Sequence, residues 1–176
     1  MTDVRTLAAV SLPLISTLTR ALAERDQPAA TFRALDRLLA KVVGHRLFTA
    51  LLYRPKDGIA ERLYSSRPDI YPASGTKALE QAPAMKRVLT SGTPYIGEDA
   101  GDIERDFPDH DRIFALGCGS VLNMPVRWHG EVLGQINLLH EARHFGKADL
   151  PIVEAMAQIV VPAFLIAAEH APGGGR

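Results

Sequence analysis

The sequence predicts one α+β domain, in which a central antiparallel sheet carries helices on one face and an irregular segment on the other. Apolar residues recur three or four positions apart near both ends of the chain, which is typical of amphipathic helices. Residues 119–140 form a predicted β-hairpin whose two faces are both largely apolar, so both faces should be covered. A chain of 176 residues is also long enough to bury one substantial core.

The first part of the chain predicts two helices and a strand pair. Apolar spacing predicts one helix over residues 4–22 and a second after the cap and early proline at residues 26–28, ending at Gly44. Two short apolar runs, residues 47–53 and 59–65, then flank a turn rich in proline and glycine. These elements should be helix, helix, strand and strand.

The middle of the chain is less regular. Residues 67–75 are predicted to be a loop, residues 83–90 a short helix and residues 95–96 a brief strand. Residues 98–111 carry seven acidic side chains, and we expect short helical turns on a solvated, mobile surface there. After the hairpin, Asp149 begins a predicted long helix that closes the domain.

A two-residue turn gives the hairpin a definite register. With His129 and Gly130 as a two-residue turn, the sequence predicts five facing pairs on one side of the hairpin. They are Trp128 with Glu131, Val126 with Leu133, Met124 with Gln135, Leu122 with Asn137, and Ser120 with Leu139. This register places Asn123 on the opposite face from Gln135 and Asn137.

Composition argues against several classes of protein. Twenty basic residues balance twenty acidic ones and are scattered, so nucleic acid and anionic membranes are not expected partners. The most apolar stretch, residues 159–168, contains Pro162 and falls short of the roughly twenty residues of a membrane helix. One cysteine and an N-terminus without the pattern of a signal peptide indicate a cytoplasmic protein.

Three stretches, residues 32–53, 120–138 and 145–157, match the helix-to-strand start, the central hairpin and the closing helix of one family in order and spacing. From Ala29 to Glu169 the chain resembles the GAF domain. The resemblance implies a GAF-like sheet of six strands or fewer, with terminal helices on one face and a small-ligand pocket on the other. It does not imply a particular ligand, and neither the residue set of cyclic-nucleotide-binding members nor a bilin-attachment cysteine is recognisable.

The resemblance also divides the chain into three parts. Residues 1–28 are expected to be an N-terminal helix used for dimerisation, residues 29–170 the GAF-like domain, and residues 171–176 a disordered tail. Because members of the family often dimerise through their terminal helices, we expect a homodimer.

Candidate ligand-binding residues fall into two groups. Polar residues that interrupt the apolar strands need partners when buried, and those partners are either a ligand or the backbone and water; they are Ser120, Asn123, Gln135 and Asn137. Aromatic residues of the middle segment are either walls of the pocket or plain core; they are Tyr64, Tyr71, Tyr95, Phe107 and Phe114.

Cys118 is the one candidate nucleophile. Its position between two glycines ahead of a strand could expose it to a pocket. The enzymatic branch of the family, the free methionine sulfoxide reductases, attacks with one thiol and resolves with a second, which this chain lacks. We interpret Cys118 as structural or pocket-lining, with thiol catalysis as the alternative.

Two further patterns suggest metals. His140 and His144 flank Glu141 in the spacing of zinc proteases, but that chemistry needs a helix and His140 ends a predicted strand, so a polar exit from the hairpin is the preferred interpretation. The acidic run of residues 98–111 lacks the glycine and terminal glutamate of a calcium loop. No catalytic residue, metal or cofactor is assigned.

These inferences predict a small-molecule-sensing or regulatory domain rather than an enzyme. The chain carries no kinase, cyclase or DNA-binding segment, so a ligand-dependent change is expected to pass to a separate signalling protein. The alternatives are a free methionine sulfoxide reductase that uses Cys118 and a ligandless dimerisation scaffold.

Overall fold

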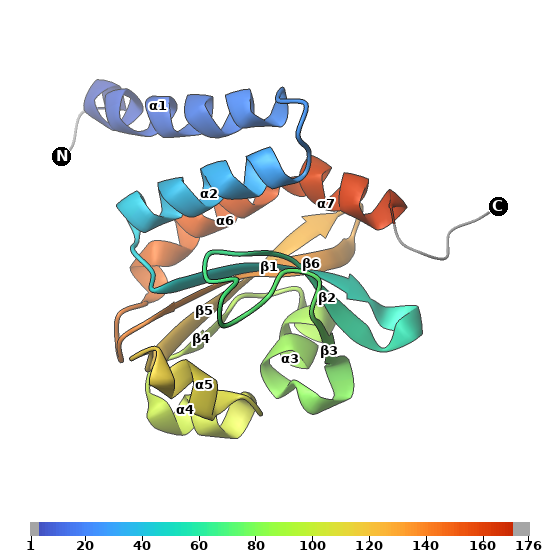
Figure 1. The fold of residues 1–176 in the computed structure, drawn as a ribbon. Helices are drawn as coiled ribbons and strands as arrows, with labels where there is room; N and C mark the ends of the chain where they lie inside the picture. The colour runs from blue at the N-terminus through green and yellow to red at the C-terminus, as the bar shows by residue number, and fades with distance from the viewer. Residues whose placement is uncertain (1–3, 171–176) are drawn as a thin grey trace.

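The computed structural model describes residues 4–170 and has an α+β architecture built on one six-stranded antiparallel sheet (Figure 1). The strand order is β3-β2-β1-β6-β5-β4. The strands are β1 (Leu47–Arg54), β2 (Ile59–Ser65), β3 (Thr76–Ala78), β4 (Tyr95–Gly97), β5 (Ser120–Trp128) and β6 (Glu131–His140). The predicted fold class is confirmed, and the short edge strand β3 is the strand that sequence reasoning did not predict.

The helices divide between the two faces of the sheet (Figure 1). One face carries α2 (Ala29–Val42), α6 (Leu150–Ile159) and α7 (Val161–Glu169), and α1 (Val4–Leu22) packs on α2 as an outer layer. The other face carries α3 (Pro83–Ser91), α4 (Ala100–Asp106) and α5 (His110–Ala115). Single 3-10 turns, η1 (Pro55–Asp57), η2 (Leu79–Gln81) and η3 (Lys147–Asp149), complete the chain.

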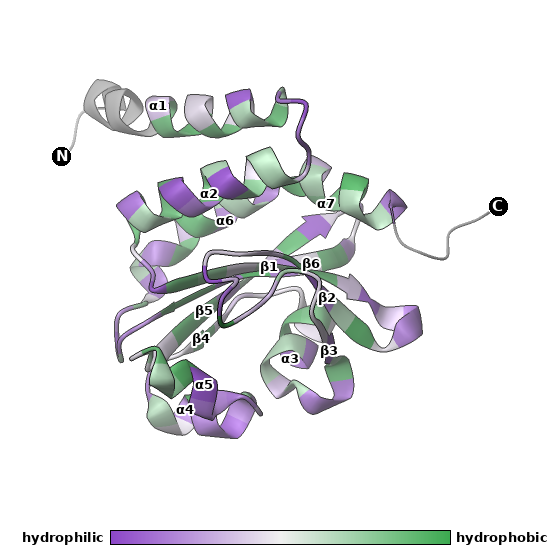
Figure 2. Ribbon diagram, viewed as in Figure 1, coloured by the Kyte–Doolittle hydropathy of each residue, from purple (hydrophilic) through white to green (hydrophobic). Residues whose placement is uncertain are grey.

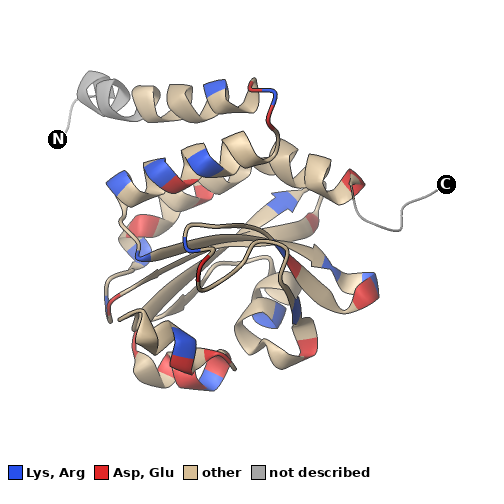
Figure 3. Cartoon of the chain, viewed as in Figure 1, with Lys and Arg blue, Asp and Glu red and all other residues tan. Residues whose placement is uncertain are grey.

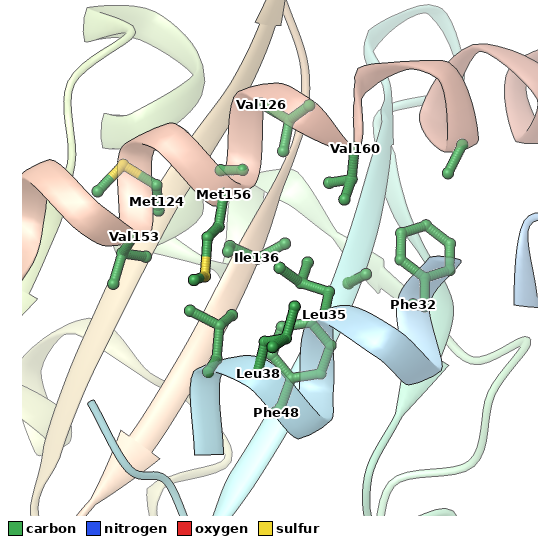
Figure 4. Packing of buried hydrophobic residues seen from close by; sticks show 14 of the residues in the cluster. Phe32, Leu35, Leu38, Phe48, Met124, Val126, Ile136, Val153, Met156 and Val160 are labelled. Carbon is green, nitrogen blue, oxygen red and sulfur yellow. The ribbon is translucent and has the colours of Figure 1, made fainter. Parts of the chain in front are cut away.

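The main core lies between the sheet and the terminal helices. Phe32 of α2 meets Phe164 of α7 edge to face, with ring centroids 5.4 Å apart. Phe32 and Leu35 of α2, Phe48 of β1 and Val160 belong to the same cluster (Figure 4). The apolar side of α2 turns toward the sheet, and that of α1 turns toward α2 (Figure 2). Charged residues collect on the outer side of α2 and on the α4–α5 region (Figure 3), so burial of the apolar stripes fixes the orientation of the helices.

The predicted closing helix is two helices. α6 ends at Ile159 and α7 begins at Val161, with a bend of 45° between the two parts and Pro162 in the first turn of α7. Among residues 4–170, no single helix is long and apolar enough to cross a membrane, although this bent pair passes that test by length and composition. The predicted tail at residues 171–176 lies outside the described residues.

The hairpin forms as predicted, but most of its predicted register is wrong. His129 and Gly130 have φ values of 53° and 83°, as a type I′ turn requires, and Trp128 does face Glu131. A β-bulge next to Val126 then leaves Leu133 as an extra residue, so that Val126 pairs with Gly134. Every later pair shifts by one position: Met124 faces Ile136, Leu122 faces Leu138, and Ser120 faces His140.

Candidate functional site

A small cavity lies between the sheet and the segment that runs from the end of β2 to α5. Its floor is formed by β1, β2 and β6, and its volume is about 30 Å³. Its apolar walls are Leu47, Leu51, Tyr71, Met85, Phe107, Ile113 and Leu139. Its polar walls are Thr49, Arg62, Lys77, Asp109 and Asn137. This volume holds one or two water molecules, so the cavity is small.

A chain of buried hydrogen bonds fixes the polar part of the floor. The hydroxyl of Tyr53 donates to Gln135 Oε1, and Gln135 Nε2 donates to Asn137 Oδ1. Asn137 Nδ2 then donates to Thr49 Oγ1 over 2.9 Å. Because each of these side chains is at least 94% buried, the bonds hold the amides in one orientation and present Asn137 and Thr49 to the cavity.

An ion pair bridges the cavity from one wall to the other. Lys77 Nζ of β3 lies 2.6 Å from the carboxylate of Asp109, which precedes α5. Burial raises the pKa of Asp109, but the charge and hydrogen bond of Lys77 outweigh it and leave that pKa below its ordinary value. Both side chains are about one-fifth exposed, so the pair links the sheet edge to the covering segment near the cavity mouth.

Two polar groups at the cavity have no hydrogen-bond partner among the described residues. They are Nε of Arg62 and the hydroxyl of Tyr71, both of which are buried atoms. Burial raises the pKa of Tyr71, and the nearby charge of Asp109 raises it further, although Asp109 accepts no hydrogen bond of ordinary geometry from it. Buried polar groups without a hydrogen-bond partner are rare in folded proteins, so this cavity is a candidate ligand site.

The predicted ligand-binding residues separate into three groups. Tyr71, Phe107 and Asn137 line the cavity, and Gln135 is bonded to Asn137. Tyr95, Phe114, Cys118 and Asn123 belong to the same side of the sheet but do not reach the cavity. Tyr64 and Ser120 lie on the opposite side.

Two bulges, one in β2 and one at Leu133 of β6, explain why Tyr64 and Ser120 lie on the opposite side. Between Ala50 and Leu51 the register of β1 with β2 shifts, so Tyr64 pairs with Ala50 and packs on Phe32 and Phe48. Ser120 faces the side of the terminal helices and donates from Oγ to the carbonyl of Glu141 over 2.7 Å. Sequence alternation alone does not reveal either bulge.

The shifted hairpin register places Asn123 beside Asn137 on the cavity side of the sheet. The two residues are direct cross-strand partners, and Tyr95 pairs with Asn123 on its other side. Asn123 is fully buried, and neither atom of its amide has a hydrogen-bond partner among the described residues. Asn123 is therefore an unsatisfied amide one strand away from the cavity.

The acidic segment is the expected solvated face for most of its carboxylates, but not for Asp106 and Asp109. Asp106 is only 2% exposed and accepts hydrogen bonds from Tyr95 and Arg105. Asp109 pairs with Lys77 at the cavity mouth. The arginine and lysine partners come from other parts of the sequence or from the segment itself, so charge counting alone mistakes these two carboxylates for surface groups.

Cys118 lies in a closed environment. The thiol is buried, does not line the cavity, and has only a long contact of 3.9 Å with the carbonyl of Leu116. Burial raises the pKa of Cys118 to about 11, against a smaller lowering by Arg46. A thiol with this pKa is almost entirely protonated at neutral pH and is a poor nucleophile.

The two histidines of the zinc-protease pattern are not on a helix. His140 ends β6, and the rings of His140 and His144 stack with centroids 3.7 Å apart. His144 Nε2 lies 2.7 Å from the carbonyl of Val43. Within residues 4–170, no three His, Cys, Asp or Glu side chains are placed to share a metal ion.

Sequence reasoning missed all three charged residues of the lining, Arg62, Lys77 and Asp109. Arg62 had one detectable signal, because it is a charged residue inside a predicted strand of otherwise mixed polarity. Lys77 belongs to a three-residue strand that propensity does not reveal. Asp109 is one of seven acidic residues in residues 98–111, and the sequence does not distinguish it from the others.

Comparison with known proteins identifies the fold. The family model described as the GAF domain matches residues 28–163. The chain belongs to the GAF family. Membership gives it a sensing or regulatory role in the general sense, and no curated protein matches it by sequence.

Solved structures share the fold of this GAF domain at low identity. The GAF domain of an Acinetobacter phosphoenolpyruvate-protein phosphotransferase superposes with a TM-score of 0.73 at 12% identity, covering 97% of this chain and 98% of that one. A free methionine-R-sulfoxide reductase from Neisseria meningitidis, in complex with its substrate, gives 0.69 at 14% identity, covering 97% and 96%. Residues 122 to 287 of a methyl-accepting chemotaxis protein give 0.67 at 17% identity, covering 89% and 98%.

Proposed function

We propose that this GAF domain is a cytoplasmic small-molecule sensor whose ligand occupies the cavity between the sheet and residues 67–116. The observation that carries the proposal is the combination of apolar walls with buried polar atoms that lack partners, in Arg62 and Tyr71. Ligand sites are typically apolar hollows with a few well-placed polar groups. A ligand would supply the missing acceptor.

Binding requires the covering segment to move. A cavity of about 30 Å³ admits water but not a metabolite. The helical part of the cover, α4 and α5, would have to swing away from β3, which stretches or breaks the pair between Lys77 of β3 and Asp109. The ligand then stabilises the open arrangement, and its occupancy shifts the population between closed and open forms.

The sheet offers a route from the cavity to the terminal helices. Along β1, Thr49 and Leu51 face the cavity, while Phe48, Ala50 and Leu52 belong to the main core under α2, α6 and α7. A displacement of β1 is therefore felt on both faces. The proposed output is an altered surface on the terminal helices, which a separate signalling protein in contact with the homodimer would read.

Binding without catalysis is favoured by the state of Cys118. The thiol is buried, lies away from the cavity walls, and has its pKa raised to about 11 by burial. A free methionine sulfoxide reductase needs a reactive thiolate next to its substrate. Purified protein with dithiothreitol is expected to leave free methionine sulfoxide unreduced, and turnover that is lost in Cys118→Ser would contradict the proposal.

The decisive experiment is a thermal-shift screen with amino acids, nucleotides, tetrapyrroles and aromatic acids. A ligand that binds the native state raises the melting temperature in proportion to its occupancy. Ile113→Phe fills the cavity and should remove the shift, whereas Ile103→Phe, an equally buried change in the same layer but outside the cavity walls, should keep it. A flat screen, or a shift that survives Ile113→Phe, would count against the proposed site.

A further inference from the structure

We infer that the ligand of this site is a small carboxylate with an apolar body, and that its carboxylate pairs with Arg62. The inference rests on the proposed function and adds the chemical class of the ligand. It follows from the free hydrogen-bond donors at the cavity, from the charge of its walls and from the distribution of its apolar side chains.

Arg62 lines the cavity, and its guanidinium is only partly bonded to protein groups among the described residues. Its Nη1 donates to the carbonyl of Pro72 over 2.9 Å, and its Cζ lies 5.3 Å from the ring centroid of Tyr71. These two contacts hold the guanidinium plane in place. Nε is buried and has no partner among the described residues. Nε and Nη2 together form the edge of an arginine that binds two carboxylate oxygens side by side.

Gly75 makes this position of Arg62 possible. A Cβ atom at residue 75 would lie 2.6 Å from Nη1 of Arg62, which is closer than real side chains approach. The backbone of the same loop also clamps the strand, since Arg62 N donates to the carbonyl of Gly75 over 2.7 Å and Ser74 N donates to the carbonyl of Arg62 over 2.9 Å. The loop is therefore shaped around the guanidinium.

Tyr71 places a second donor beside Arg62. Its hydroxyl is a buried atom of a residue that lines the same cavity, and it interacts with the nearby carboxylate of Asp109 without a hydrogen bond of ordinary geometry. Nε of Arg62, which has no acceptor among the described residues, and the Tyr71 hydroxyl, which has only a poorly placed one, suit a ligand group that accepts hydrogen bonds. An ionised carboxylate accepts through both oxygens, whereas an ammonium group would only add donors.

The charges on the cavity walls do not cancel. Lys77 and Asp109 neutralise each other at 2.6 Å, which leaves the positive charge of Arg62 without a counterion in the lining. Arg112 adds a further positive field near Arg62. Burial lowers the pKa of Arg62, as expected for a desolvated guanidinium, and the charge of Asp109 offsets this in part. An anion balances the site.

The rest of the cavity favours an apolar body. Leu47, Ile113 and Leu139 of the lining belong to one apolar cluster, and Leu51 and Met85 belong to a second. The amide of Asn137 already accepts from Gln135 and donates to Thr49, so this part of the floor makes no strong demand for a second polar group. A short aliphatic or aromatic carboxylate matches these walls.

The test uses probes that differ only in the acidic group. Hexanoate is compared with hexanamide and hexan-1-ol, and phenylacetate with phenylacetamide, by NMR titration of the full-length protein labelled at arginine side chains and methyl groups. The two carboxylates should bind about tenfold or more tightly than their neutral partners. They should also shift the Nε–Hε signal of Arg62 and the methyl signals of Ile113.

Three variants separate charge from geometry. Arg62→Met should remove the preference for carboxylate over amide, and Arg62→Lys, which keeps the charge but lacks the fork, should lose about tenfold in hexanoate affinity. Arg67→Met is the matched control, because Arg67 pairs with Asp69 on the surface and does not line the cavity. Its affinity should not change. Circular dichroism establishes whether each variant is folded. If Arg62→Met does not fold, the loss of hexanoate affinity in Arg62→Lys alone tests the role of Arg62.

The contrary outcomes are distinguishable from failure of the proposed site. Neutral probes that bind as tightly as the carboxylates would overturn the carboxylate inference while supporting the cavity as a ligand site. Absence of binding by all five probes would also overturn the inference, and the broader thermal-shift screen with Ile113→Phe would then decide the proposed function separately.

Discussion

The hydroxyl of Tyr95 donates a 2.6 Å hydrogen bond to the buried carboxylate of Asp106. This bond ties the edge strand β4 to the end of α4, and Arg105 donates to the same carboxylate over 2.7 Å. Arg87 completes the cluster, with its guanidinium 5.1 Å from the ring centroid of Tyr95. The acidic segment is thus anchored to the sheet through a charge that has almost no contact with water.

Tyr95→Phe should destabilise the protein by about 1.5–3 kcal/mol, because a buried carboxylate loses a charge-assisted hydrogen bond. Tyr64→Phe is the matched control, since Tyr64 makes a 2.8 Å bond to Asp36 on the other face. The side chain of Asp36 is 17% exposed and that of Asp106 only 3%. Water can therefore replace the lost hydrogen bond at Asp36 better than at Asp106, and Tyr64→Phe should cost less stability. Urea unfolding at neutral pH measures both losses, and equal losses would contradict the prediction.

Asp106→Asn should flatten the acid limb of the stability curve. Burial raises the pKa of Asp106, but hydrogen bonds from Arg105 and Tyr95 and the charge of Arg87 outweigh it and leave the pKa below its ordinary value. A depressed folded-state pKa adds stability above the unfolded pKa of about 4, and this stability is lost as pH falls through the folded-state value. The variant should therefore be less stable at neutral pH but lose less on acidification.

The measurement for this prediction is the melting temperature from neutral pH down to about pH 3, across the range where aspartates titrate. Asp57→Asn is the control, because Asp57 is exposed in the turn between β1 and β2. That variant should follow the acid limb of the unmodified protein. An Asp106→Asn curve that runs parallel to the unmodified one would refute the role given to this carboxylate.

Asn123→Leu should stabilise the protein by about 1 kcal/mol, because it replaces an unsatisfied buried amide with an apolar group of similar volume. Its cross-strand partner gives a control of opposite sign. Asn137→Leu removes hydrogen bonds to Gln135 and Thr49 and should destabilise by about 1–3 kcal/mol. A loss of stability in Asn123→Leu would show that an ordered water satisfies the amide.

Gly134→Ala should cost about 3 kcal/mol or more, or prevent folding. A Cβ atom at this position would collide with the carbonyl of Leu51 and lie 2.8 Å from Cε1 of Phe164. Neither the strand backbone nor the packed ring can retreat easily. Gly146→Ala is the control, since a Cβ there meets nothing within 4 Å, and it should change stability little. Chemical denaturation of both variants measures the difference.

The proposed homodimer predicts that charges on α1 weaken association. Leu12 is 60% exposed and Ile15 is 38% exposed on this helix, although α1 already packs on α2. The double change Leu12→Glu and Ile15→Glu should shift the protein toward monomer in sedimentation velocity, because an interface would have to bury the new charges. Thr19→Glu, at an exposed position of the same helix, is the control. A monomer at all concentrations in the unmodified protein would refute the homodimer.

Periodicity was sufficient to predict most elements of the fold. α1, β2 and the central hairpin have the predicted bounds or nearly so, because the apolar residues of α1 recur at the helical period and turn residues mark the ends of the strands. β3 escaped prediction because three residues are too few to show a period. The break between α6 and α7 was missed because both halves bury apolar residues and only Pro162 marks the join.

The candidate site was harder to predict than the fold. Tyr71, Phe107 and Asn137 line the cavity as anticipated, since aromatic and amide residues in buried surroundings are visible in a sequence. Arg62 and Asp109 acquire their roles from neighbours more than eight positions away, such as Pro72 and Lys77. Tyr64 changed sides because one extra residue in β2 reverses the direction of the side chains that follow it.

The bulge at Leu133 has a consequence for comparing this chain with its relatives. An alignment that matches the two hairpin strands residue for residue from the turn assigns each residue of β6 beyond the bulge to the wrong side of the sheet. Asn137 would then be scored as a neighbour of Leu122 in the main core instead of Asn123 at the polar floor. The side of the sheet that each residue of β6 faces should therefore be counted with a one-residue offset beginning at Leu133, so that cavity-facing and helix-facing positions are kept apart.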